Sequence, residues 1–155
     1  MWTGALVGIF IAPAAKAAMV SVSEAHAIPG HGLEGDRYFA NIGTFSKGHR
    51  PDSELTLIES EAIEALAHEE SVSLDAGDAR RNLVTRGVAL NHLVGREFMV
   101  GEVRVFGHRL CEPCAHLGQL TGHTAIVRTL LHRAGLRAEV LTEGIVRTGD
   151  TIRPI

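Results

Sequence analysis

The chain has 155 residues, 45% of them apolar, which is enough to bury one hydrophobic core, so we expect a single domain over residues 1–155. A net charge of −3 and the lack of a basic stripe argue against a nucleic-acid partner. No segment reaches the roughly 18 to 20 apolar residues that cross a membrane, and two cysteines are too few for a disulfide framework, so we expect a cytoplasmic protein without a membrane partner.

The first 28 residues combine an apolar run with small-residue triplets, as a secretory signal does. However, no Lys or Arg precedes the run, and Lys16 stands where cleavage would occur. Residues 5–11 fit equally well a buried strand that ends at Pro13. We favour the strand.

Residues 19–28 predict a second strand, and a glycine-rich loop from Pro29 to Ser53 follows it. Loops of this length are usually functional or mobile. This one carries Asp36, Arg37 and further basic residues. We therefore expect it to be mobile and to face a site.

The rest of the chain alternates short apolar segments with two helical patterns. We expect strands at 54–58, 80–87, 136–141 and 144–155, a hairpin at 96–110, and helices at 59–70 and 124–135. The first helix places Ala62, Ile63, Leu66 and Ala67 on one face. About seven strands with two helices predict a mainly β fold, a partly closed β-barrel with two or more short α-helices.

Both cysteines lie in the stretch RLCEPCAHLGQLTG, residues 109–122, with Glu112 and Pro113 between them. One interpretation is a thioredoxin-like redox pair, which needs an exposed thiolate beside a resolving thiol. Such a pair begins a long helix, whereas two glycines follow Cys114 within eight residues. The context of a redox pair is therefore missing.

A second interpretation is a zinc site, because thiolate and imidazole ligands lie close together in the chain. They are Cys111, Cys114, His116 and either His108 or His123. The spacing of these residues does not match a zinc finger. A third interpretation is that both cysteines are small buried hydrophobic side chains. Their polar and basic neighbours argue against burial and favour the thiolate, which attacks electrophiles and binds metals.

Five segments in register resemble the MOSC domain family, named for the C-terminal domain of molybdenum cofactor sulfurases. The segments are GLEGDRY, LTLIESEAIEAL, RRNLVTRGVALNHLVGREFMVGEV, LCEPCAHL and GLRAEVLTEGIVRTGD. Together they extend the resemblance from about residue 5 to residue 153. The resemblance implies a MOSC-type β-barrel.

The resemblance also implies function. Family members bind the molybdenum cofactor or carry sulfur as a cysteine persulfide, so the chain is expected to serve a molybdenum-dependent oxidoreductase reaction or a sulfur transfer. The working cysteine of the family corresponds to Cys114, which in some relatives is a direct molybdenum ligand. In those relatives an arginine precedes it, whereas Pro113 stands here.

The cofactor is a phosphate-bearing pterin and needs cationic partners, which guanidinium groups supply in pairs of hydrogen bonds. The candidates for binding it are Arg81 and Asn82, followed by Arg37 and Arg86. We expect Arg81 to face solvent and to share one cleft with Cys114, about one nanometre away. One interpretation of Asp36 is that it fixes Arg37 by a salt bridge.

Nothing in 155 residues resembles the pyridoxal-phosphate desulfurase half of a complete sulfurase, so no pyridoxal phosphate site is expected in this chain alone. A cysteine desulfurase or a molybdoenzyme is the partner that the resemblance implies. The rival hypothesis is a non-catalytic zinc- or anion-binding barrel, which the nine histidines suggest.

Overall fold

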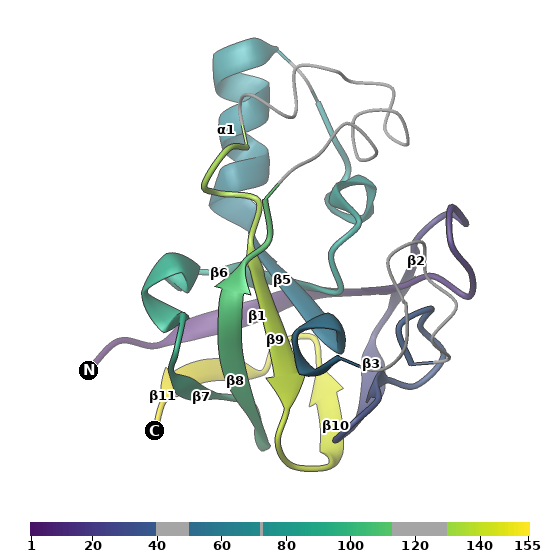
Figure 1. Ribbon diagram of the computed structural model, residues 1–155. Coiled ribbons are helices and arrows are strands. Elements are labelled where there is room, and N and C mark those ends of the chain that lie inside the picture. The colour runs from purple at the N-terminus through teal and green to yellow at the C-terminus, as the bar shows by residue number, and fades with distance from the viewer. Residues whose placement is uncertain (40–49, 72, 113–129) are drawn as a thin grey trace.

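Short strands form most of the regular structure of the chain (Figure 1). The computed structural model describes residues 1–39, 50–71, 73–112 and 130–155, and the statements below concern these ranges. The strands are β1 (Gly4–Ile11), β2 (Val20–Val22), β3 (Glu24–Ile28), β4 (Gly32–Leu33), β5 (Leu55–Glu59), β6 (Leu83–Arg86), β7 (Glu97–Val100), β8 (Val103–Leu110), β9 (Leu136–Val140), β10 (Gly144–Arg147) and β11 (Thr151–Pro154). The helices are α1 (Ser60–Glu70) and the short 3-10 helices η1 (Pro51–Ser53), η2 (Ala76–Ala79) and η3 (Leu90–Leu93).

Seven strands close into a barrel in the order β1, β11, β7, β8, β9, β5, β6 and back to β1. Neighbours in this ring are antiparallel except β5 and β6, which run parallel with Leu57 opposite Leu83. Strand β2 extends the edge of β1, and β10, β3 and β4 form a separate small sheet. The predicted mainly β barrel is confirmed. It is closed because β1 pairs with both β6 and β11.

Strand β5 is buried on both faces and separates two apolar clusters. Leu57 and Leu83 belong to the cluster inside the ring, whereas Ile58 packs in a second cluster with residues of α1. Because successive strand residues point to opposite faces, an unbroken apolar run suits this position. The buried face of α1 includes Leu66, as the spacing predicts, but Ala67 of the expected face is exposed. In the described ranges no helix is both long and apolar enough to cross a membrane.

Four expected elements differ from the structure. The strand expected at 144–155 is divided into β10, which pairs with β3, and β11, which pairs with β1 and β7 in the barrel. The single strand predicted at 19–28 is divided, because β2 pairs with β1 whereas β3 pairs with β10 in the other sheet. The loop predicted from Pro29 to Ser53 contains β4 and η1, and its residues 40–49 lie outside the described part. The helix predicted at 124–135 also lies mostly outside it, and its last residues form a turn.

Candidate functional site

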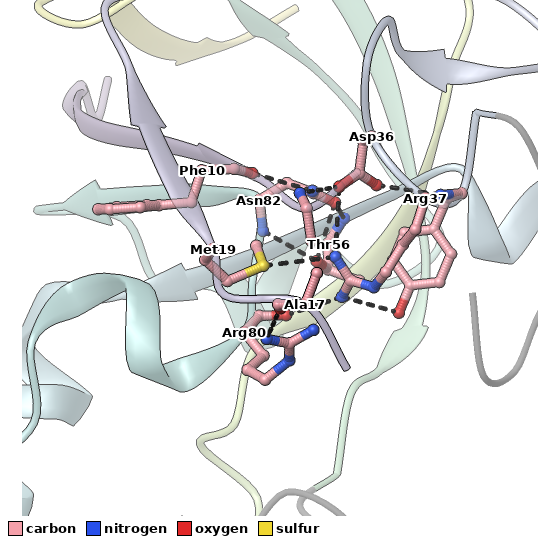
Figure 2. A network of polar contacts seen from close by, with 10 residues as sticks. Phe10, Ala17, Met19, Asp36, Arg37, Thr56, Arg80 and Asn82 are labelled. Carbon is pink, nitrogen blue, oxygen red and sulfur yellow. Dashed lines mark hydrogen bonds and ion pairs between the residues drawn. The ribbon is translucent and has the colours of Figure 1, made fainter. Parts of the chain in front are cut away.

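The candidate site lies where β1 ends and β6 begins. Four segments that are distant in sequence meet there: residue 12, residues 17–19, residues 36–38 and residues 80–82 (Figure 2). Three arginines belong to these segments, Arg37, Arg80 and Arg81, and we call them the arginine cluster.

Asp36 is the buried carboxylate of the site. It accepts hydrogen bonds from the backbone N–H groups of Ala12, at 2.9 Å, and Tyr38, at 3.2 Å. Its Oδ1 also lies 3.2 Å from Nη1 of Arg37, which confirms the expected salt bridge. A buried carboxylate requires such partners, since an unpaired buried charge is strongly unfavourable. Asp36 therefore ties the end of β1 to the Arg37 segment.

Arg37 is only 5% exposed and uses its guanidinium to join other parts of the chain. Besides Asp36, it donates to the sulfur of Met19 at 3.5 Å and to the carbonyl oxygen of Arg80 at 3.3 Å. The same group lies over the ring of Tyr38, 4.4 Å from its centre, and donates to its hydroxyl. These contacts occupy both terminal nitrogens, so Arg37 acts as a cross-link that supports Arg80.

Asn82 is fully buried and aligns the starts of β5 and β6. Its Oδ1 accepts hydrogen bonds from the backbone N–H and the hydroxyl of Thr56, both at 3.1 Å. Its Nδ2 donates to the carbonyl oxygen of Phe10 at 3.1 Å. The side chain therefore joins β6 to β5 and β1, and this arrangement is structural (Figure 2).

Arg81 is 8% exposed, which corrects the expectation that it faces solvent. Its Nε donates to the carbonyl oxygen of Ala134 at 2.9 Å. Its two terminal nitrogens form no hydrogen bond within the described residues. The Nε atom of Arg81 therefore binds the protein backbone, whereas its two terminal nitrogens remain able to bind an anion.

Arg80 carries the third guanidinium of the cluster and has a left-handed backbone conformation, with φ of 61°. Its side chain donates to the carbonyl oxygen of Ala17. Burial, followed by the positive charge of Arg37 and with a contribution from Arg81, lowers the pKa of Arg80, although Tyr38 and Asp36 act in the opposite direction. Burial is the main cause of this shift, and the charges of Arg37 and Arg81 add to it.

Two more carboxylates, of Asp75 and Asp78, line a shallow cavity of about 450 Å³ beside Arg80 and Lys16. Both are exposed, and both form hydrogen bonds within their own segment. The side chain of Asp78 accepts a hydrogen bond from the backbone N–H of Asp75, and the side chain of Asp75 caps η2 in return. Within the described residues, Asp36 is the carboxylate in direct contact with the arginine cluster. The cluster therefore keeps a net positive charge.

The strand that leads to Cys114 ends beside Arg81. The backbone N–H of Cys111 donates to the carbonyl oxygen of Gly135 at 2.8 Å, one residue after the carbonyl that binds Arg81. Gly135 has φ of 110°, and a Cβ on it would lie 1.8 Å from the carbonyl oxygen of Leu57, so only glycine fits this turn. Arg81 and Cys111 are thus anchored to consecutive residues.

Glu112 adds further contacts to the turn before β9. Its carboxylate accepts the backbone N–H of His132 at 3.0 Å and lies 3.1 Å from the Nδ1 of that residue. Cys114, two residues further, lies outside the described part of the chain. Glu112 and Leu130 are the described residues on either side of positions 113–129, and Glu112 binds His132, two residues after Leu130.

Arg86 lies apart from the cluster, at the opposite end of β6. It is exposed and forms an ion pair with Glu64 of α1. Of the four candidate cofactor-binding residues, the structure brings together Arg37, Arg81 and Asn82 and leaves Arg86 elsewhere.

Sequence reasoning did not select Arg80 or the pair formed by Glu112 and His132. The adjacent arginines, Arg80 and Arg81, were visible in the sequence. The left-handed backbone of Arg80 and its contact with Ala17, however, depend on the folded chain. Glu112 is separated from His132 by 20 positions, and no periodic pattern connects them. Only the turn before β9 brings them into contact.

These features define a class: a small closed β-barrel with a positively charged, partly buried corner next to a cysteine-bearing segment. The family model described as MOSC domain matches residues 34–153. The chain therefore belongs to the MOSC domain family, which is associated with molybdenum cofactor sulfurases, and the resemblance drawn from the five segments is confirmed. No curated protein matches the chain.

Solved structures share the fold. The YuaD protein from Bacillus subtilis has a TM-score of 0.82 at 22% identity, over 98% of this chain and 97% of its own. YiiM from Geobacillus stearothermophilus has a TM-score of 0.77 at 14% identity, over 98% of this chain and 75% of its own. YiiM from Escherichia coli has a TM-score of 0.69 at 16% identity, over 97% of this chain and 69% of its own. At these identities the similarity concerns the fold.

Proposed function

We propose that this MOSC domain binds the molybdenum cofactor, with Arg81 as a ligand of its phosphate and Cys114 as the thiolate that approaches its metal. One observation carries the proposal: the Arg81 guanidinium is held in place by Ala134 through Nε, while its terminal nitrogens are unused within the described residues. A pre-oriented fork of this kind suits bidentate recognition of phosphate.

The residues present fit a phosphate-bearing pterin. Arg80 and Arg81 are adjacent, and within the described residues Asp36 is the one carboxylate that contacts the cluster directly, so an anion would be attracted to this end of the barrel. Arg37 and Asn82 are expected to support the site rather than contact the ligand, because their polar atoms already bind protein groups. Arg86 is not part of the proposed site.

Cys114 is proposed as the working thiol. The segment that contains it leaves the described structure two residues after Cys111, which is anchored next to the Arg81 contact. Nearby positive charge stabilises a thiolate over a thiol. When bound, the cofactor supplies a molybdenum centre, a soft metal for which thiolate is a suitable ligand.

The same thiolate could serve sulfur transfer. It would attack the outer sulfur of a persulfide on a cysteine desulfurase, take up that sulfur as Cys114 persulfide and release the donor as a thiolate. The sulfur would then pass to a molybdoenzyme. A carrier and a cofactor-dependent oxidoreductase are distinguished by what the purified protein holds.

The test is to purify the protein from a host that makes the molybdenum cofactor and to measure molybdenum, zinc, pterin and cysteine persulfide. We expect near-stoichiometric pterin and molybdenum in the unmodified protein. Arg81→Gln should lose most of both, whereas Arg86→Gln, an exposed arginine of the same strand region, should retain them. Cys114→Ser should lose molybdenum, and Cys111→Ser should keep it.

The alternatives give different results. If the purified protein held a persulfide on Cys114 but no pterin, the function would be sulfur transfer and not cofactor binding. Stoichiometric zinc, with neither pterin nor persulfide, would favour the non-catalytic zinc barrel and overturn the proposal. Equal losses in Arg81→Gln and Arg86→Gln would show that the arginine cluster is not the binding site.

A further inference from the structure

A second cleft lies at the end of β6 opposite the arginine cluster, and we propose that it binds a small aromatic carboxylate. The cleft has a volume of about 1000 Å³, within the range of sites for drug-sized ligands. It is lined by residues from both chain ends and from the segment that follows β6, among them Trp2, Gly87, Val94, Arg96, Glu97 and Ile155. This proposal is independent of the cofactor proposed above.

The cleft is separate from the candidate site. Gly87 follows the last residue of β6, whereas Arg81 stands before its first residue. At about 3.3 Å per strand residue, the two positions are about 20 Å apart. Figure 1 shows both chain ends near β7 and β11, and Trp2, Pro154 and Ile155 from these ends line the cleft. A ligand here would not reach the arginine cluster.

The apolar wall of the cleft includes an aromatic face. Trp2 packs on the barrel core and is half-buried, so one part of its indole is supported while another lines the cleft. Val94, 41% exposed, adds apolar surface. A flat indole beside aliphatic groups favours a planar aromatic ligand, which can stack against it.

Arg96 supplies the charge. Its backbone is fixed, because its N–H donates to the carbonyl oxygen of Leu93 at 3.1 Å and its own carbonyl oxygen accepts the N–H of Gly107 at 3.0 Å. Its guanidinium forms no hydrogen bond or ion pair within the described part of the chain, including with Glu97 and Ile155, which line the same cleft.

Among the described residues that line the cleft, Arg96 is the only arginine or lysine, and Glu97 is the only acidic side chain. The carboxylate of Glu97 lies 3.4 Å from Nη1 of Arg104, on the neighbouring strand β8, and is thereby partly neutralised. A single guanidinium fork beside an indole matches one carboxylate attached to a ring. A phosphate dianion would require more positive charge than the cleft offers.

The chain contains one tryptophan, so the indole N–H of Trp2 gives one resonance in a ¹⁵N-labelled sample and reports directly on the cleft. The probes are 2-naphthoate and its neutral analogue 2-naphthamide. We expect a saturable shift of the Trp2 resonance with 2-naphthoate, and binding of the amide that is weaker by about tenfold or more, the loss expected for a charge-assisted pair of hydrogen bonds.

Arg96→Gln should reduce naphthoate affinity to that of the amide, and Arg96→Lys should give an intermediate affinity because it keeps the charge but loses the fork. The matched control is Arg147→Gln, an exposed arginine paired with Glu24 in the other sheet, which should bind as the unmodified protein does. The full amide spectrum of each variant shows that it is folded. Equal affinity for acid and amide, no saturable Trp2 shift, or unchanged affinity in Arg96→Gln would overturn the proposal.

Discussion

The guanidinium of Arg81 and the carbonyl oxygen of Ala134 form a buried hydrogen bond of 2.9 Å. The two residues are 53 positions apart, so the bond joins the start of β6 to the turn that precedes β9. The next carbonyl of that turn, of Gly135, accepts the N–H of Cys111. Two consecutive carbonyl groups of this turn therefore hold the Arg81 guanidinium and the backbone that follows β8. A substitution of Arg81 should affect both the stability of the fold and the proposed binding site.

Arg81→Met should lower the free energy of unfolding by about 1 to 3 kcal/mol, because the buried carbonyl of Ala134 loses its donor. Arg86→Met removes an exposed arginine from the other end of β6 and should change stability by less than about 1 kcal/mol. Denaturant unfolding followed by circular dichroism measures both. Equal losses in the two variants would contradict a structural role for the Arg81 bond.

Asn82→Ala should be more damaging, with a loss of about 3 kcal/mol, because it leaves the buried N–H of Thr56 and the carbonyl oxygen of Phe10 without their partners. The control is Asn91→Ala, since Asn91 is exposed and donates one hydrogen bond to His132. That control should cost less than about 1 kcal/mol. A loss in Asn82→Ala no larger than in the control would mean that the network is not formed in solution.

The barrel was predictable because its strands carry local signals. The hairpin at 96–110 shows alternating residues on both sides of Gly101, and β7 and β8 pair there with Val100 opposite Val103. The helix at 59–70 has a clear apolar face and appears as α1. In both cases the pattern is contained within about a dozen residues, so tertiary structure was not needed to see it.

The site was less predictable because its contacts are distant in sequence. Arg37 and Arg81 were chosen as cations, yet burial and partners, which the sequence does not show, divide their roles: Arg37 is fully used and Arg81 only partly. Asn82 follows Arg81 directly, but it points to Thr56 and Phe10 and is structural. Residue type identifies candidate ligands, whereas the fold decides which of them have free atoms.

The two cysteines should differ in reactivity. Cys111 is 3% exposed and a free thiol, so it should be inert in the folded protein. In Cys114→Ser the remaining thiol should react with a maleimide about a hundredfold more slowly in buffer than in denaturant, because reaction requires local opening. In Cys111→Ser the remaining thiol should react rapidly in buffer. Fast labelling of Cys111 in the folded protein would show that the structure of this corner is wrong.

Glu59 provides a test of pH dependence. It stands at the N-terminus of α1 and is half-buried. Burial, and secondly the negative charge of Glu61, raises the pKa of Glu59, although a hydrogen bond from the backbone of Leu90 and the charge of His92 act in the opposite direction. A carboxyl group whose pKa is higher in the folded than in the unfolded state makes the ionised folded protein less stable.

Glu59→Gln should therefore raise the free energy of unfolding at pH 7, by about 0.5 kcal/mol, the scale of a partly exposed electrostatic effect. Below the ordinary glutamate pKa of about 4.3 the carboxyl group is protonated in both states, so the gain should vanish at pH 3.5. As pH rises through the raised pKa of the folded state, the difference between variant and unmodified protein should grow and then stay constant.

Glu102→Gln, a change at an exposed turn, should show no such growth. Urea unfolding at pH 3.5, 5 and 7 measures the difference, and a gain that is largest at pH 3.5 would reverse the sign inferred for Glu59.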